Sequence, residues 1–207
     1  KLHLQKIILY FNIMKNFCIA FWTAACLLIS SSGYAQSEWK NNFSDQGEIL
    51  KTVGRGECSI ADGVFRSKGS YACFGNPEWK NYTMSFKARA PKEAEQVQIW
   101  AGFRANNRFD RYVVGLKGGL QDDLYLMRMG YMGTDEFMGV RPLGFHPVPG
   151  QWYKLKVEVC GSRIRIFLND EKEPRMDITD KNSNLAPSGP VTLGGGWIET
   201  EFDDLVV

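Results

Sequence analysis

The dominant pattern of the chain is an alternation of apolar and polar residues with a period of two. It runs through residues 82–90, 96–105, 111–117, 123–129, 152–159 and 163–169. Successive side chains of a β-strand point to opposite faces of a sheet, so this period predicts strands. Turn-forming residues separate these segments, and no long stretch has a helical period. The pattern therefore predicts a single all-β domain, a sandwich or a barrel.

More strands are expected on either side of this region. Asp62-Gly63 lies between the short runs ECSI and GVFRSK, and this dipeptide favours the tight turn of a hairpin. The segments PVTLGG and EFDDLVV supply the last strands. Leu205 and Val207 alternate out of phase with Phe202, which indicates a β-bulge near Asp203-Asp204.

The alternation also assigns faces to the predicted strands. The residues expected in the core are Val97, Ile99, Ala101, Phe103, Leu155, Val157, Val159, Ile164, Ile166 and Leu168. On residues 96–105 the opposite face carries Trp100 and Arg104, and on residues 111–117 Arg111 opposes Tyr112. The outer faces of the sheets are therefore expected to carry aromatic and arginine side chains.

The N-terminal region has a different pattern. Met14 and Lys15 precede an apolar run over residues 17–29, and small residues follow it as SSGYAQ. A charged start, an apolar segment and a small-residue cleavage site are typical of a secretory signal peptide. We predict upstream translated sequence over residues 1–13, the signal peptide over residues 14–35 and the β-sandwich domain over residues 36–207.

Two alternatives compete with a cleaved signal peptide. A membrane helix needs roughly twenty apolar residues, and the run here is about thirteen residues long. A lipoprotein would use Cys26, but apolar residues continue past it as LLI. Export to the periplasm, the outer surface or the medium is therefore expected, with no membrane segment after cleavage.

Removal of the signal peptide changes the charge balance. The whole chain has 25 basic and 23 acidic residues, and residues 1–35 contain Lys1, Lys6 and Lys15 but no acid. The mature part then has 25 − 3 = 22 basic against 23 acidic residues, a net charge of −1. No basic block remains, so nucleic acid is not an expected partner.

Cleavage leaves three cysteines, Cys58, Cys73 and Cys160. Export permits a disulfide, and Cys58 and Cys73 flank the predicted hairpin and are candidates to pair. The alternative is that all three are buried thiols that act as small apolar residues. No pair has C-x-x-C spacing and His146 is the only histidine left, which argues against a structural zinc site.

Three segments resemble a known family. They are QIWAGFRANNRFDRYVVGLKG, GQWYKLKVEVCGSRIRIFLND, and GPVTLGGGW followed by FDDLVV. They are similar to the concanavalin A-like lectin and glucanase sandwich, in particular to laminin G-like modules and to the keto-disaccharide hydrolase-like domain of secreted bacterial proteins. The match covers about residues 80–207 well and residues 37–79 loosely. The resemblance implies a jelly roll of two antiparallel sheets and a role with glycans, but it does not imply a particular sugar.

A sugar-binding site needs aromatic platforms for the C–H faces of the rings and polar groups for the hydroxyls. The candidates on or beside three successive predicted strands are Trp100, Arg104, Arg111, Tyr112, Tyr125 and Tyr131. The alternative for each is a packing role in cross-strand pairs. Trp152 opens a core strand directly after Pro149-Gly150 and is interpreted as structural.

The acidic residues near the end of the chain raise the question of catalysis. Glu199, Glu201 and Asp203 have a spacing of two and share a face in a regular strand. Laminarinase-type glucanases of the resembled fold use acids in the pattern Glu-x-Asp-x-(x)-Glu, and the order here departs from it. We therefore assign no catalytic residue. Asp203 and Asp204 at the expected bulge are candidates for a structural calcium ion, with backbone carbonyls supplying further ligands.

Two functions remain open at this stage. The first is a non-catalytic module that binds an oligo- or polysaccharide, as the front part of a larger glycoside hydrolase with a catalytic domain downstream in the same chain. The second is a glucanase-like or keto-disaccharide hydrolase-like enzyme that acts with its own carboxylates across a cleft. The first is favoured, because no second carboxylate pair is placed convincingly.

The signal peptide is directly testable. Expressed from Met14 in a bacterial host, the protein is expected outside the cytoplasm with an N-terminus near Gln36, which N-terminal sequencing detects. A cytoplasmic product that retains Met14 would contradict this prediction.

Overall fold

The structure is a computed structural model that describes residues 37–44, 49–106, 110–130 and 135–207. The predicted leader, residues 1–35, and Tyr131 lie outside the described residues. The described chain is almost entirely β-structure, and its strands all belong to one compact unit, Glu38–Val207. Within the described ranges, no helix has the length and apolar character needed to cross a bilayer.

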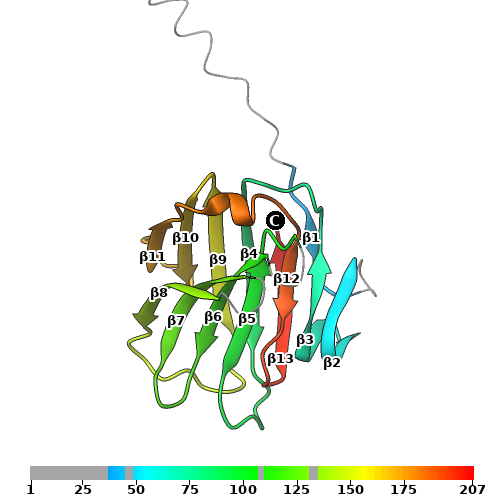
Figure 1. Cartoon of the computed structure of the whole chain (residues 1–207). Helices are drawn as coiled ribbons and strands as arrows, with labels where there is room; N and C mark the ends of the chain where they lie inside the picture. The colour runs from blue at the N-terminus through cyan, green and yellow to red at the C-terminus, as the bar shows by residue number, and fades with distance from the viewer. Residues whose placement is uncertain (1–36, 45–48, 107–109, 131–134) are drawn as a thin grey trace, which may run out of the picture. The chain divides into compact units, whose positions relative to one another are not determined.

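The elements follow one another as antiparallel strands with one short 3₁₀-helix (Figure 1). They are β1 Lys40–Asn41, β2 Lys51–Ala61, β3 Val64–Phe74, β4 Tyr82–Arg89, β5 Gln98–Phe103, β6 Arg111–Lys117, β7 Asp123–Met129, β8 Glu136–Pro142, β9 Tyr153–Cys160, β10 Arg163–Leu168, β11 Met176–Thr179, η2 Ser183–Leu185, β12 Val191–Gly194 and β13 Thr200–Val206.

The strands form two layers that β3 joins. The order is β11-β10-β9-β4-β13-β3-β12-β5-β6-β7-β8, with β1 added to β13 and β2 added to β3. The first part of β3 pairs with β13 and its last part pairs with β12, so this strand runs from one layer to the other. At the opposite side β8 lies against β11. The expected β-sandwich is confirmed, and in Figure 1 the C-terminal strand β13 lies beside the early strands β3 and β4.

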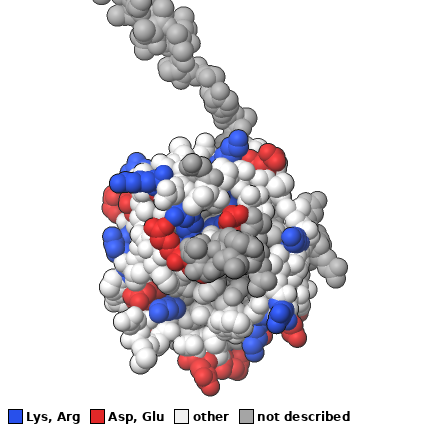
Figure 2. Space-filling model, in the orientation of Figure 1, with Lys and Arg blue, Asp and Glu red and all other residues white. Residues whose placement is uncertain are grey.

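The apolar faces of both layers meet in one core. All ten residues that the alternation assigned to the core are at most 2% exposed. They pack with residues of the strands that the pattern did not resolve in detail, including Phe65, Phe74 and Phe202. Most charged side chains lie outside, with both signs interspersed on the face shown in Figure 2, whereas a few are buried, namely Arg104, Arg111, Arg128, Asp180 and Glu201. Burial of a continuous apolar core therefore decides which way each strand faces.

The turn and the bulge expected from the sequence are both present. Asp62 and Gly63 have φ angles of 55° and 71°, as a tight hairpin turn between β2 and β3 requires. The register of β13 against β4 shifts between Asp203 and Val206, and Asp204 has a φ of 51°. This confirms the bulge near Asp203-Asp204.

Two expectations need correction. The alternation indicated no strand between residues 130 and 149, but this segment contains β8, an edge strand whose mostly exposed residues leave no clear alternation. The proposed pair of Cys58 and Cys73 is also wrong. The hairpin register places Cys58 opposite Ser67 and Cys73 opposite Lys51, and all three cysteines are free. The two pairs are six residues apart along β3, about 20 Å at the rise of a β-strand.

The bend of β3 requires a glycine on the neighbouring strand. A methyl group on Gly56 would overlap with the backbone carbonyl oxygen of Lys68, whereas one on Gly63 would meet nothing within 4 Å. Gly63→Ala is expected to cost about 1 kcal/mol, the cost of its positive φ. Gly56→Ala is expected to cost clearly more, because the backbone itself must shift. Chemical denaturation of both variants checks this, and equal losses of stability would contradict it.

Candidate functional site

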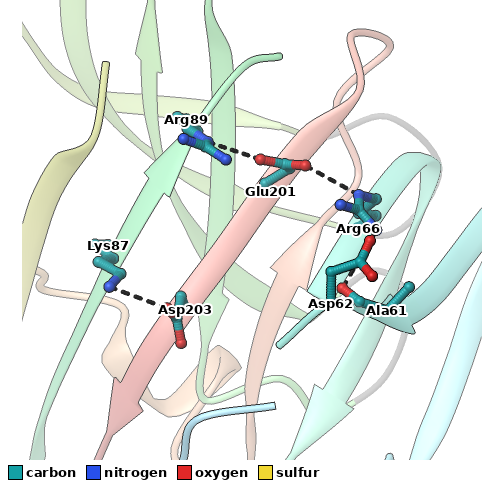
Figure 3. A network of polar contacts seen from close by, with 7 residues as sticks. All are labelled: Ala61, Asp62, Arg66, Lys87, Arg89, Glu201 and Asp203. Carbon is teal, nitrogen blue, oxygen red and sulfur yellow. Dashed lines mark hydrogen bonds and ion pairs between the residues drawn. The ribbon is translucent and has the colours of Figure 1, made fainter. Parts of the chain in front are cut away.

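The carboxylate of Glu201 is clamped between two arginines on the outer face of β13 (Figure 3). Arg66 Nε donates to Oε1 at 2.9 Å, and Arg89 Nε donates to Oε2 at 2.7 Å. The side chain is nearly buried, and both of its oxygens have charged donors. This arrangement stabilises a permanent anion and leaves neither oxygen free to attack or protonate a substrate.

The protonation of Glu201 follows from the same contacts. Burial alone raises the pKa of this carboxyl, but the hydrogen bonds from Arg89 and Arg66 outweigh burial and hold the pKa below its ordinary value. A general acid in a glycosidase needs the opposite shift. The geometry and the direction of the pKa shift therefore both support a structural role for Glu201.

Asp203 and Asp204 share a cation that the protein itself supplies. Lys87 Nζ lies 3.0 Å from Asp203 Oδ2 and 2.9 Å from Asp204 Oδ2. Within the described ranges, no group of three or more histidine, cysteine or acidic side chains is placed to hold a metal ion. A calcium ion at these two aspartates would have to displace the Lys87 ammonium, so the donor set present does not fit the ion. The sequence pattern makes Asp203 and Asp204 only candidate ligands of a structural calcium ion, and that hypothesis stays a prediction.

The outer face of the other layer is different, because it carries a second apolar cluster. Val113, Tyr125 and Met127 are buried there, with Trp100 and Met129 packed against them. Leu124 and Leu126, which alternate with these residues on β7, belong to the main core. The cluster therefore lies on the side of β5, β6 and β7 that faces away from the core.

The aromatic rings of this cluster are in contact. The ring centroids of Trp100 and Tyr125 are 6.4 Å apart with an angle of 85°, and those of Tyr125 and Phe137 are 5.8 Å apart. Gly115 is the cross-strand partner of both Trp100 and Tyr125, and any side chain there would overlap with the Tyr125 ring. The glycine thus lets the tyrosine lie over the sheet.

The cluster continues toward β3 through an arginine. Arg111 Cζ lies 3.7 Å from the centroid of the Tyr71 ring, and Arg111 Nε donates to Met129 Sδ at 3.3 Å. A methyl group built on Gly195 would lie 3.6 Å from Trp100, 3.8 Å from Tyr71 and 3.9 Å from Arg111. These side chains therefore meet around the Gly195 backbone.

An exposed tryptophan borders the same surface. Gln98 Oε1 accepts a hydrogen bond of 2.7 Å from the Trp197 backbone N–H, and the Trp197 side chain is 75% exposed. Phe137 is 64% exposed at the β8 end. We call this surface the aromatic face, and it comprises Tyr71, Trp100, Arg111, Tyr125, Phe137 and Trp197.

The structure brings together half of the residues that the sequence proposed for ligand binding. Trp100, Arg111 and Tyr125 lie side by side on the aromatic face. Tyr112 lies apart from them in the core, where its O–H donates to Asp180 Oδ2 at 2.7 Å. Tyr131 lies outside the described residues.

The expected common face of Trp100 and Arg104 needs correction. β5 ends at Phe103 and Arg104 has a φ of 47°, so the alternation stops before Arg104. The arginine is buried, and its Nε donates to the carbonyl of Lys80 at 2.8 Å, on the segment that leads into β4. Its side chain thus links the two layers.

The comparisons with known proteins agree with this architecture. No family model matches the chain, and no curated protein matches it in sequence. Among solved structures, it is similar to the carbohydrate binding module CBM66 from Bacillus subtilis, with a TM-score of 0.55 and 16% identity over 77% of this chain and 92% of that chain. It is also similar to a laminarinase from Flavobacterium sp. UMI-01, with a TM-score of 0.53 and 8% identity over 82% of this chain and 98% of that chain.

A third neighbour is a Bacillus subtilis protein of unknown function with a galectin-like fold, with a TM-score of 0.55 and 11% identity over 81% of this chain and 94% of that chain. The chain has the concanavalin A-like jelly-roll fold. At these identities the likeness establishes the fold alone. The expectation of this fold from the sequence is confirmed, whereas the site must be argued from its own residues.

Three members of the aromatic face were missed in the sequence. Tyr71 belongs to the long strand β3, whose alternation with Cys73 was not followed. Phe137 lies on the edge strand β8, and Trp197 follows a run of glycines. Phe137 and Trp197 are large aromatic residues in polar or glycine-rich segments, but singly exposed apolar residues are common on protein surfaces, so the sequence contains no decisive signal for them.

The Glu201 clamp gives a stability prediction. In Glu201→Gln only one acceptor remains for two arginines, so we expect a loss of about 1.5–3 kcal/mol at pH 7, the range for a hydrogen bond to a charged group. Because the folded pKa is depressed, this contribution is present above the unfolded pKa near 4.5 and is lost as the pH falls through the lower folded pKa.

Denaturation of wild type and variant at pH 7 and pH 3 measures this difference. Glu57→Gln is the control, because Glu57 is exposed on β2. A stability gap between wild type and Glu201→Gln that is independent of pH would contradict the prediction.

Proposed function

We propose that the protein binds an oligo- or polysaccharide on the aromatic face. The observation that carries the proposal is a set of touching aromatic rings and one arginine on the outer side of a concanavalin A-like sheet. Sugars present apolar C–H faces to rings and hydroxyl edges to polar groups, so a surface of this composition suits them. A carbohydrate binding module and a laminarinase among the structural neighbours support the same proposal.

The distribution of carboxylates favours binding over hydrolysis. Among the described strand residues on the outer face of β5, β6 and β7, Asp123 alone is acidic, and it lies opposite Lys117. Glycoside hydrolysis uses two carboxylates on either side of the scissile bond. On the other outer face, Glu201 and Asp203 are bound to basic side chains. The proposal is therefore a non-catalytic, exported module that serves glycan degradation.

The exposed rings provide the direct test. We expect Trp197→Ala and Phe137→Ala each to weaken binding about tenfold, since truncation of an interface aromatic commonly costs more than about 1.4 kcal/mol. Trp100→Ala is expected to weaken it by a similar factor. Affinity electrophoresis on β-glucans, xylans, mannans and fructans finds a ligand, and calorimetry measures the affinities.

The matched control is Trp152→Ala, which removes a tryptophan from the opposite outer face. There Arg89 Cζ lies 4.4 Å from the Trp152 ring centroid. This variant is expected to bind like wild type. Equal losses in Trp152→Ala and Trp197→Ala, or unchanged affinity in all aromatic-face variants, would refute the site. Release of reducing sugar from a bound glycan would favour hydrolysis instead.

A further inference from the structure

A pocket adjoins the aromatic face at Tyr71. Its volume is about 180 Å³, and most of its lining is apolar, with Leu50, Val53, Tyr71, Cys73, Pro77 and Pro190. The lining also includes Lys51 and Asn106, which are both exposed residues. Tyr71 is therefore shared, because it stacks against Arg111 on the aromatic face and also forms part of the pocket wall.

The pairing of two strands builds one side of this pocket. Val53 lies opposite Tyr71, and Lys51 lies opposite Cys73 in the register of β2 against β3. The four side chains therefore share the outer face of the hairpin. The segments that follow β5 and precede β12 supply the other side, where Ala105 N–H donates to the Pro190 carbonyl at 3.1 Å.

Apart from the exposed side chains of Lys51 and Asn106, the pocket offers few hydrogen-bond donors. The backbone N–H groups of Leu50, Ala105 and Gly189 are all used, and they donate to the carbonyls of Cys73, Pro190 and Trp79 at 2.9, 3.1 and 2.9 Å. Burial raises the pKa of the Cys73 thiol, so it is a neutral, weakly polar group. A sugar ring placed here would find side-chain donors at Lys51 and Asn106, and its other hydroxyls would lose hydration without replacement, which is costly. The lining instead favours an apolar group.

The volume decides the size of that group. An apolar cavity of about 150 Å³ in a protein is known to take a benzene molecule, so a pocket of about 180 Å³ is large enough for an aromatic ring. A methyl or acetyl group would leave most of the pocket unfilled and would lose packing contacts. The proline and tyrosine side chains in the wall supply flat apolar surfaces for a ring.

We propose that this pocket receives an aromatic ring that is covalently carried by the glycan. The ring belongs to an aromatic acyl ester or to an aryl aglycone, and both present the same planar apolar group. The inference rests on the proposed function, because the sugar part lies on the aromatic face while the ring enters beside Tyr71.

The first arm of the test compares phenyl β-glucoside with methyl β-glucoside, which share the sugar and differ in the ring. We expect phenyl β-glucoside to bind at least tenfold more tightly, as burial of a ring-sized apolar surface implies. Protein NMR of the whole mature chain locates the contact, with shifts at Val53, Cys73 and Ala105 for the phenyl compound only. The second arm compares feruloylated arabinoxylan oligosaccharides with the same oligosaccharides after alkaline removal of the ester.

A pair of variants separates the pocket from the fold. Val53→Phe fills the pocket from a partly exposed position on β2 and is expected to abolish the preference for the phenyl compound. Thr52→Phe places the same ring on the opposite face of the strand. This variant is expected to retain the preference for the phenyl compound. Amide spectra that match the wild type outside the hairpin establish that both variants fold.

The outcomes distinguish the proposed pocket for an aromatic ring from the proposed glycan site on the aromatic face. A response in either arm supports the pocket and identifies the source of the ring as aglycone or ester. No shift at the pocket in either arm overturns the inference, even if polysaccharides still bind on the aromatic face. Equal pocket shifts with phenyl β-glucoside and free phenol, together with no glycan bound in the panel, would overturn the glycan proposal and leave only a site for aromatic rings.

Discussion

The two layers depend on one strand that belongs to both. β3 pairs with β13 through Phe65–Ser67 and with β12 through Tyr71–Phe74, so it has to bend between these stretches. Gly69 has a φ of 69° at that point, and its N–H donates to the Gly196 carbonyl at 2.7 Å. A register shift in β2 lies opposite the bend. The bend sets the direction of every later side chain of β3, and it therefore places Phe74 in the core and Tyr71 on the outside.

The outer faces of the two layers carry side chains of different kinds. On the layer of β4 and β13, ion pairs and cation–π contacts satisfy the charged groups, as Glu201 with its two arginines shows. On the layer of β5, β6 and β7, apolar side chains cover the outer face, and no strand of the described residues is packed against it. Phe137 and Trp197 at the borders of this face leave large apolar side chains exposed to solvent, so the second face is the one expected to have a partner.

Alternation predicted the central strands because their two faces differ in polarity, and residues 82–89, 111–117 and 123–129 are strands almost as expected. It failed at β8 because an edge strand that is largely exposed has no face to keep apolar. It assigned Arg104 to the face of Trp100 because a positive φ that ends the alternation leaves no mark in a single sequence. Tyr71 and Phe137 join the site through pairings between strands, and Trp197 joins it through a hydrogen bond to Gln98. Local pattern carries no information on these contacts.

Arg111 on β6 connects Tyr71, which the pocket and the aromatic face share, to the packed strands β6 and β7. Its guanidinium lies on the Tyr71 ring, and its Nε is hydrogen-bonded to Met129 on β7, so the wall that the pocket shares with the aromatic face is connected to three strands. Groups held by packed strands lose little entropy when a ligand binds, which favours affinity. Leu50 and Val53 form the other wall, at the start of β2 and on β2, which is paired only with β3. The pocket therefore combines one fixed wall with one on an edge strand, and adaptation to different substituents is expected on the β2 side.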